Sequence, residues 1–572
     1  MKVTNDMIAN QFNELADLLE IDGANPFRIR AYRTAARNIG SLGKPVEEMI
    51  KQGQDLTDIP GIGSDLAQKI QEIVKTGRLA LLKGTATKFP KQLTELMKLS
   101  GLGPKRVKML HDKLGIKSLA QLKKAIAKGE LKKLRGFGET LIAKVQEAVE
   151  HREEYKKTTK LTDTELTADQ LLAHLKASKA IKDVAVAGSF RRRKEVVGDL
   201  DILVSATNAK NAIEQFIKFP LVKTVTARGT TRAAVRLASG LQVDLRVVPK
   251  KSFGAALLYF TGSKAHNIAL RRRAVEKHLK LNEYGLFEGK SSIAGATEKQ
   301  VYRALGLPYI EPELREDRGE IEIALHKNLP KLIELDDIRG DLHTHTSETD
   351  GTESLEAMAK AAASLGYEYV AITDHSKHLT VTNGLNEKRL RKQIEAIDRL
   401  NLRLKGITVL KSIELDILED GTLDLDDSVL KELDLTVCSI HSRFNLPEKK
   451  QTERIIRAMD NRYFNILAHP TGRLVNLRPA YQVDIERIMK AAVERGCYLE
   501  INGQPERLDL DDIHCQMAKD LGLKLAISTD AHSSTHFAYM KYGIYQARRG
   551  FLEKADVINT RTLSQLRKLL KR

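Results

Sequence analysis

The chain is poor in cysteine and has no long apolar run. Its three cysteines, Cys438, Cys497 and Cys515, are far apart and form no CxxC pair, so the sequence predicts neither a disulfide framework nor a zinc finger. A reducing compartment is therefore expected. No run of about 18 apolar residues occurs, and the first residues lack the apolar core of a signal peptide. These absences argue against a membrane-spanning or secreted protein and favour a cytoplasmic one.

Basic residues are abundant, and their excess lies in the first half. Residues 1–300 contain 54 Lys and Arg against 32 Asp and Glu, whereas residues 301–572 contain 40 against 43. This excess of +22 predicts that the first half binds a polyanion, because Lys and Arg contacts to phosphates release condensed counterions. The alternative is a surface that is basic only for solubility. The length of 572 residues, 42% of them apolar, allows three to five domains.

Three similar segments near the N-terminus place Gly-x-Gly before a helical apolar pattern: IPGIGSDLAQKI (59–70), LSGLGPKRVKML (99–110) and LRGFGETLIAKV (134–145). The pattern predicts a tight turn followed by a helix N-terminus, where backbone N–H groups and the helix dipole favour a phosphate. The glycines are Gly61, Gly63, Gly101, Gly103, Gly136 and Gly138. The alternative is that glycine serves only the sterics of the turn. Before the first repeat, a segment predicted to face DNA contains Arg28, Arg30, Tyr32, Arg33 and Arg37.

Three acids in the middle of the chain predict a divalent-cation site. Asp199 and Asp201 alternate in GSFRRRKEVVGDLDILV (188–204), so they point to one face of a strand, and Asp244 in LQVDLRVVP lies on a neighbouring strand. Two Mg²⁺ ions there would support phosphoryl transfer. A triphosphate would lie against Gly188, Ser189 and Arg192, which allow close backbone approach, offer a hydroxyl and neutralise charge. This pattern specifies the reaction class but not the substrate.

A second candidate metal site follows an acidic, proline-containing connector at 316–338. Histidines and acids stand after short apolar strands that helical segments separate, and strand–helix units that close into a barrel bring such strand ends together. The candidate ligands are His343, His345, Asp350, His375, Glu414, His441, His469, Asp530 and His532. Mixed imidazole and carboxylate ligation suits two or three Mn²⁺, Zn²⁺ or Fe²⁺ ions. Arg443 and Arg473 follow ligands and either hold a substrate phosphate or are ordinary surface arginines.

The whole chain resembles the bacterial family X DNA polymerases, which are DNA polymerase beta-like and have a C-terminal polymerase and histidinol phosphatase (PHP) domain. The glycine repeats resemble helix-hairpin-helix elements, GSFRR with DxD resembles the nucleotidyltransferase palm, and LLYFTGSKAHNIALRRR (257–273) resembles the thumb. The resemblance implies a multidomain protein with an α-helical N-terminal region, an α+β palm and a distorted (β/α)7 barrel. The expected parts are a small N-terminal domain (1–80), a fingers-like DNA-binding subdomain (81–150), the palm (151–250), the thumb (251–315), a linker (316–338) and the PHP domain (339–572).

The resemblance also implies residue roles. Asp244 is the general base, and Arg271 contacts the templating strand. The nucleotide contacts are Gly188, Ser189, Arg192, Gly198, Tyr259, Phe260, Gly262, Lys264 and Asn267. Lys69 matches a lysine that forms a Schiff base with an abasic sugar, but Asp65 stands where the family has another lysine, so lyase activity stays open.

The expected function is template-directed filling of short gaps in DNA repair, including base excision repair. The PHP domain is expected to add a metal-dependent 3′–5′ exonuclease and, in addition, abasic-site endonuclease or 3′-phosphatase activity. We expect gapped or primed DNA and deoxynucleoside triphosphates as partners, Mg²⁺ or Mn²⁺ in the palm, a monovalent cation at the helix-hairpin-helix motifs, and a monomer associated with the nucleoid. Two alternatives remain: a template-independent nucleotidyltransferase, and a DNA-end-binding scaffold with a small-molecule phosphoesterase barrel.

Overall fold

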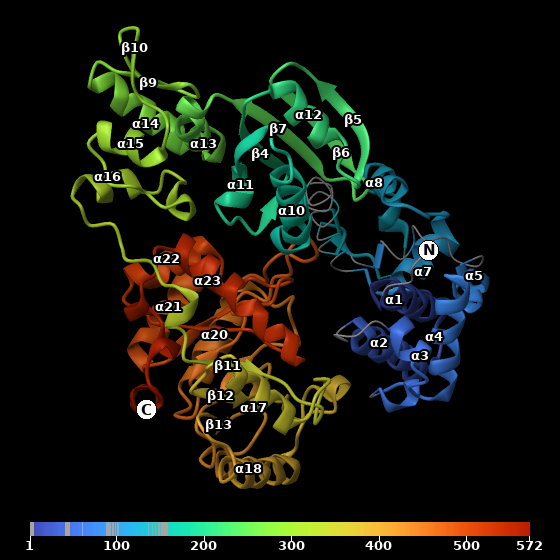
Figure 1. Cartoon of the computed structure of the whole chain (residues 1–572). Helices are drawn as coiled ribbons and strands as arrows, with labels where there is room; N and C mark the ends of the chain where they lie inside the picture. Colours follow the sequence, from blue (N-terminus) through green and yellow to red (C-terminus); the bar gives the residue numbers. More distant parts are fainter. Residues whose placement is uncertain are drawn as a thin grey trace. The chain divides into compact units, whose positions relative to one another are not determined.

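The computed structural model describes residues 5–40, 46–59, 61–86, 93, 96, 97, 99, 102–134, 136–139, 141–143, 145, 146, 149 and 158–572. The chain folds into two compact units, the first made mainly of residues before 156 and the second mainly of residues after 155. Figure 1 shows the first unit in blue to cyan and the second in green to red. Within the described residues, none of the helices combines the length and the apolar character needed to cross a bilayer.

The described part of the first unit is helical. Its elements are α1 (Asn5–Asp22), α2 (Pro26–Gly40), α3 (Val46–Lys51), η1 (Leu56–Asp58), α4 (Ser64–Thr76), α5 (Ala80–Ala86), α7 (Pro104–Leu114), α8 (Leu119–Ala127) and η2 (Glu130–Lys133). Helices α4 and α7 begin directly after Gly63 and Gly103 and end at glycines in the left-handed region, Gly77 and Gly115. The helix starts predicted at 64 and 104 are therefore present.

The second unit begins with a five-stranded mixed sheet in the order β2-β4-β7-β6-β5. Leu200, Ile202 and Val204 alternate with the acids of β4 and pack, with β7 residues, against helices α10 and α12 (Figure 1). The strands predicted to hold Asp199 with Asp201 and Asp244 are thus β4 and β7. The elements are β1 (Thr159–Lys160), α10 (Leu161–Lys176), β2 (Ile181–Val186), α11 (Gly188–Arg191), β3 (Val196–Val197), β4 (Asp199–Ala206), α12 (Ala209–Ile217), β5 (Val222–Arg228), β6 (Arg232–Leu237) and β7 (Gln242–Val248).

A smaller α+β part follows the sheet. Its elements are η3 (Lys250–Ser252), α13 (Phe253–Thr261), α14 (Lys264–Glu276), β8 (Lys280–Asn282), β9 (Gly285–Glu288), β10 (Ser291–Ala294), α15 (Glu298–Ala304), η4 (Pro312–Leu314) and α16 (Glu320–Leu325). Strands β8, β9 and β10 form an antiparallel sheet. Ile321 and Ala324 of α16 belong to the core of this part. The segment that the sequence suggested as a linker thus includes a packed helix.

Parallel strands alternate with helices in the remainder of the chain. The strands are β11 (Gly340–Thr344), β12 (Tyr369–Ile372), β13 (Thr408–Lys411), β14 (Glu414–Asp416), β15 (Val437–Ser439), β16 (Ile466–Leu467), β17 (Tyr498–Asn502) and β18 (Leu525–Ser528). β13 and β14 are separated by only Ser412 and Ile413 and together occupy one strand position. The strands named above therefore fill seven strand positions. A parallel bridge between Thr344 and Ala531 connects the first strand to the last. The arrangement is the distorted (β/α)7 barrel expected from the sequence.

Helices surround these strands. They are η5 (Leu335–Asp337), α17 (Leu355–Ser364), η6 (Thr380–Thr382), α18 (Glu387–Asn401), α19 (Asp427–Leu430), α20 (Glu448–Met459), α21 (Ile485–Arg495), α22 (Asp512–Asp520), η7 (Ser534–Tyr539), α23 (Met540–Arg549), η8 (Lys554–Asp556), η9 (Ile558–Thr560) and α24 (Leu563–Leu569). Strand residues such as Val370 and Ile372 pack with the helix residues Met358 and Leu390, whereas the alternate residue Ala371 belongs to a second cluster. Apolar residues thus fix the strands from both faces and leave the strand ends for polar side chains.

Candidate active sites

The three acids of the palm lie on one face of its sheet. Strands β4 and β7 are parallel neighbours, and their register pairs Asp201 with Asp244. Asp199 is two residues before Asp201 on the same strand and therefore points the same way. Among the described residues, the three carboxylates do not form a group as tight as those of the barrel, in which the ligand atoms lie within 4.8 Å of one another.

The electrostatics of this face indicate a need for cations. Burial raises the pKa of Asp201, and the like charges of Asp199 and Asp244 raise it further, to about 7, against the opposing effect of Arg192 and Arg246. Burial and Asp244 also raise the pKa of Asp199. Arg192 and Arg246 therefore do not fully compensate the charge of the three acids, and divalent cations, which prefer oxygen ligands, would supply the rest. The donor set fits Mg²⁺ or Mn²⁺.

Gly188 allows the palm backbone to approach these acids. Its φ is +63°, and a Cβ atom built there would lie 2.4 Å from Oδ2 of Asp201. No side chain fits at that distance, and the left-handed backbone also favours glycine. The neighbouring Ser189 is half-buried, and Gly198 is exposed directly before β4. Glycine is thus required at 188 for two independent reasons.

Arginines of α11 and the following turn connect the palm to the thumb. Arg191 donates two hydrogen bonds to Glu298, with N–O distances of 2.8 and 2.6 Å. The fully buried Arg315 donates a third at 2.6 Å. Arg192 donates from Nε to Glu316 at 2.9 Å and from Nη1 to the carbonyl oxygen of Thr261. The cation predicted to meet a triphosphate is thus already paired.

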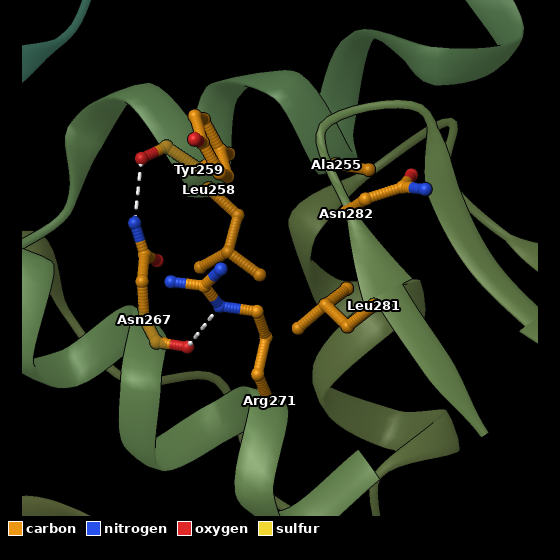
Figure 2. A pocket seen from close by; sticks show the side chains of 7 residues that line it. All are labelled: Ala255, Leu258, Tyr259, Asn267, Arg271, Leu281 and Asn282. Carbon is orange, nitrogen blue, oxygen red and sulfur yellow. Dashed lines mark hydrogen bonds between the residues drawn. The ribbon is translucent and has the colours of Figure 1, made fainter. Parts of the chain in front are cut away.

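Two of the predicted nucleotide residues of the thumb, Tyr259 and Asn267, line a small pocket together with Arg271, as Figure 2 shows. Asn267 donates from Nδ2 to the carbonyl oxygen of Tyr259 at 2.7 Å, and Arg271 donates from Nε to the carbonyl oxygen of Asn267 at 3.2 Å. Leu281 and Asn282 of β8 also line this pocket and were not identified from the sequence. Strand pairing brings them there, and no motif marks them.

The remaining thumb residues lie close to this pocket along the chain. Tyr259 is 37% exposed, and its ring packs edge-on against that of Phe260, with ring centroids 5.2 Å apart. Phe260 in turn lies under the guanidinium of Arg246 from β7, which packs 5.4 Å above its ring. Gly262 ends α13 with φ +69°, and Lys264 is exposed at the start of α14. Tyr259 is therefore the member of the aromatic pair available to a ligand.

Glu414 lies at the centre of the predicted barrel ligands. Its Oε2 is 2.9 Å from Nδ1 of His375, and its Oε1 is 3.1 Å from Nε2 of His441 and 3.0 Å from Nε2 of His469. His345 faces Oδ1 of Asp530 at 3.2 Å. Each of these residues stands at or just after the carboxyl end of a strand, with the exception of Glu414, which begins β14.

The ligand atoms form three closely spaced groups. In each group they lie within 4.8 Å of one another. The groups are His345 with Asp350, His375 and His532; His343 with His345 and Asp530; and His375 with Glu414 and His441. His469 lies beside the third group, because its Nε2 is 3.0 Å from Oε1 of Glu414. All nine residues predicted from the sequence are thus brought together.

His343 shows that the barrel residues fit metal ions. Its Nδ1 lies 2.7 Å from Oε1 of Glu500, and because a carboxylate can only accept, Nδ1 must carry the proton. Nε2 is then the ring nitrogen left to bind a metal ion. Within the described part of the chain this buried Nε2 has no hydrogen-bond partner, and it faces Glu414 at 3.5 Å and Asp530 at 3.6 Å. A carboxylate that orients a histidine from behind is typical of metal sites.

Glu500 was not identified from the sequence. It lies on β17 inside YLEIN, where an acid interrupts a buried strand, and that interruption is the signal that could have revealed it. Burial opposes a proton on His343, yet Glu500, Asp530 and Glu414 raise its pKa well above the usual value. Burial likewise opposes protonation of His441, but Glu414 and Asp416 raise its pKa to about 9. The barrel site, like the palm, needs positive charge.

The two arginines considered as phosphate ligands differ. Arg443 is 63% exposed and pairs with Glu419 at 2.8 Å, as a surface arginine does. Arg473 is 15% exposed and pairs with Glu195 of the palm at 2.5 Å. It also donates from Nε to the carbonyl oxygen of Arg507 at 3.2 Å. Arg473 therefore connects the barrel to the palm.

The helical unit modifies two expectations. Tyr32 is buried against Phe12, with ring centroids 5.5 Å apart, so its prediction as a DNA-facing residue is wrong. The exposed aromatic on α2 is Phe27, which lies under Arg30 at 4.8 Å. Lys69 forms an ion pair with the exposed Asp65 one turn earlier on α4, and its role as a lyase nucleophile stays a prediction.

The glycines of the three repeats can be compared with the predicted turns one by one. Gly61 has φ +75°, and a Cβ there would lie 2.8 Å from the Thr34 side chain. Gly136 has φ +88°, and Gly138 accepts hydrogen bonds from the N–H groups of the next turn. Gly101 lies outside the described residues. The turns are thus as predicted at the described glycines, and their binding of DNA stays a prediction.

Comparison with known proteins agrees with this layout. Family models match as a helix-hairpin-helix domain (3–79), a SAM-like helix-hairpin-helix tandem (93–150), a DNA polymerase beta palm (152–272), a DNA polymerase beta thumb (256–316) and a PHP domain (341–504). The DNA polymerase/3′-5′ exonuclease PolX of Bacillus subtilis (strain 168) is 37% identical over 562 residues, which covers 98% of each chain. The chain belongs to the bacterial family X DNA polymerases with a PHP domain.

Other relatives match parts of this family X chain. DNA polymerase lambda of Rattus norvegicus is 27% identical over 341 residues, covering 54% of this chain and 56% of its own. A probable phosphatase of Thermoanaerobacter sp. (strain X514) is 29% identical over 235 residues, covering 38% of this chain and 89% of its own. The predicted family and fold class are confirmed.

Proposed function

We propose that the palm adds deoxynucleotides to the 3′ end of a DNA primer, directed by a template, and so fills short gaps during repair. The observation that carries this proposal is the β4–β7 register, which sets Asp201 beside Asp244 on the face that Gly188 leaves open. When bound by Asp199, Asp201 and Asp244, two Mg²⁺ or Mn²⁺ ions supply activation of the attacking hydroxyl and neutralisation of phosphate charge. Asp244 accepts the proton of the primer 3′-hydroxyl.

The thumb selects the nucleotide in this proposal. Tyr259, Phe260 and Gly262 contact the sugar, Asn267 contacts the base edge, and Lys264 adds positive charge beside the nucleotide. The triphosphate lies against Gly188, Ser189, Arg192 and Gly198. Support comes from the pocket in Figure 2, which Tyr259, Asn267 and Arg271 line together. Arg271 contacts the templating strand from the same pocket. The incoming base and the template are therefore contacted by neighbouring residues.

The barrel is proposed to hydrolyse phosphodiesters at DNA 3′ ends. When bound there, two or three Mn²⁺, Zn²⁺ or Fe²⁺ ions supply Lewis-acid activation of water. The nine candidate ligands hold them, and Glu500 orients His343. Abasic-site cleavage or 3′-phosphatase activity is a second candidate, favoured because a relative named a probable phosphatase is 29% identical to this chain over 235 residues.

Gapped or primed DNA is the proposed partner of the helical unit. Helices α4 and α7 begin directly after Gly63 and Gly103, and the free backbone N–H groups of such helix starts bind a DNA phosphate without sequence preference. A monovalent cation is proposed to bind at the same motifs. We propose a monomer that acts in the cytoplasm on nucleoid DNA. A template-independent enzyme and a scaffold with inactive sites are the alternatives.

Labelled primers on gapped duplex DNA test both activities at once. With Mg²⁺ or Mn²⁺ and nucleotides, wild type is expected to extend the primer, and Asp199→Asn with Asp201→Asn to lose extension but keep shortening. His343→Ala with His345→Ala should lose shortening alone. Asp169→Asn, an exposed acid on α10, is the matched control and should retain both. Equal extension of gapped DNA and single strands would reject template direction, and loss of both activities in both double variants would reject two separate sites.

A further inference from the structure

Arg192 is the arginine proposed above to bind the nucleotide triphosphate, yet a carboxylate already occupies it. Its Nε lies 2.9 Å from Oε1 of Glu316, and Nη1 donates to the carbonyl oxygen of Thr261. The side chains of Arg192 and Glu316 are only 12% and 14% exposed. Because the pair is largely shielded from water, its attraction is stronger than that of a surface pair. A phosphate oxygen that approaches Arg192 must therefore compete with Glu316.

Glu316 has a second cation within reach. Arg549, at the end of barrel helix α23, donates from Nη1 to Oε1 of Glu316 at 3.1 Å and to the carbonyl oxygen of Arg192 at 2.7 Å. Arg549 is itself buried, and its Nη2 is fixed 2.5 Å from Oδ2 of Asp512. The carboxylate thus lies between an arginine of the palm and an arginine of the barrel.

The charge of Glu316 suits this competition. Burial opposes ionisation, but Arg192 and Arg549 outweigh it and lower the pKa of Glu316 below its ordinary value. Glu316 is therefore an anion at neutral pH and resembles a phosphate oxygen in what it offers a guanidinium. When Arg192 turns to a triphosphate, Glu316 keeps a partner in Arg549 and is not left as a buried unpaired charge, which would be costly.

We propose that Glu316 is an internal competitor of the nucleotide triphosphate for Arg192, and that Arg549 of the barrel sets its strength by offering Glu316 an alternative partner. Both are positioning residues, and the inference rests on the proposed function of the palm. It gives the barrel an influence on nucleotide affinity that is independent of its metal ligands.

The competition predicts opposite effects of two substitutions. Glu316→Gln removes the competing charge and should lower the KM for the incoming nucleotide on gapped DNA by at least about fivefold, the upper end of the effect of one exposed ion pair. Arg549→Met leaves Glu316 to Arg192 alone and should raise this KM about fivefold. In the Glu316→Gln background Arg549→Met should have no further effect, because Arg549 acts through Glu316. The value of kcat should change less than KM in each case.

Glu322→Gln, an exposed glutamate of α16, is the matched control and should leave KM unchanged. Shortening of 3′ ends by the same preparations reports an intact barrel. If Arg549→Met does not fold, Glu316→Asp, whose side chain is one methylene shorter, should lower KM in the same direction as Glu316→Gln. An unchanged or raised KM in Glu316→Gln overturns the competition, and an equal effect of Arg549→Met in both backgrounds overturns the role of Arg549. If wild type does not extend primers at all, the proposed function fails instead.

Discussion

Replacing Glu298 by glutamine is expected to weaken the connection between palm and thumb by about 3 kcal/mol at neutral pH. Burial alone would raise the pKa of Glu298, but hydrogen bonds and charge from Arg191 and Arg315 lower it from 4.5 to about 2. A shift of this size corresponds to about 3 kcal/mol, at roughly 1.4 kcal/mol per unit. Breaking a buried ion pair by removing one partner costs roughly 3–5 kcal/mol by an independent argument.

The sign of the pH dependence follows from the lowered pKa. The stabilisation is fully present above the unfolded-state pKa of 4.5 and is lost as the pH falls towards about 2. The difference between wild type and Glu298→Gln should therefore be large at pH 7 and shrink on acidification. Arg315 is fully buried and pairs with Glu298 in the wild type. In Glu298→Gln, the charge of Arg315 therefore lacks this anionic partner at every pH.

Hydrogen–deuterium exchange is a suitable assay, because it resolves one part of a multidomain chain whose global unfolding is not two-state. Peptides from α13 and α15 should lose protection in Glu298→Gln at pH 7, and less so near pH 3, after correction for intrinsic exchange rates. Glu276→Gln, an exposed residue of α14, is the control. Unchanged protection at pH 7, or an equal loss at both pH values, would refute the reasoning.

Three further outcomes are expected. Gly188→Ala should lower nucleotide addition about 100-fold by displacing Asp201, with 3′-end shortening retained; gap filling at the wild-type rate would contradict this. Glu500→Gln should weaken metal binding in the barrel about 10- to 100-fold, since the charge behind His343 is lost. Bound Mn²⁺ or Zn²⁺ after dialysis measures this, and an unchanged content would exclude it. Borohydride should not trap wild type on an abasic end, because Lys69 is held in an ion pair; an adduct absent from Lys69→Ala would show the opposite.

Local periodicity explains why the main sites could be predicted. Asp199 and Asp201 share a strand, so their common face follows from a repeat of two, and the apolar residues between them identify the buried side. The barrel ligands could be predicted for a related reason, because most of them follow a short apolar strand and parallel strands end at one rim. Neither inference required knowledge of long-range packing.

Residues that act through distant partners could not be predicted in this way. Glu500 orients His343, which lies 157 positions away in the chain. Arg473 and Glu195 are separated by 278 positions, and nothing near either residue indicates the other. Tyr32 was placed on the wrong side of α2 because its neighbours are basic, whereas packing against Phe12 decides its orientation.

Gly188 has a consequence for heritable variation. Every single-base change of a glycine codon that alters the residue introduces a Cβ atom or a stop, and any Cβ at this position would lie 2.4 Å from a carboxylate oxygen of Asp201. If selection keeps the palm acids in place, no residue that one base change can introduce is therefore tolerated at position 188. In related sequences, a side chain at this position would mark a palm whose acids have been rearranged, even where all three aspartates are still present.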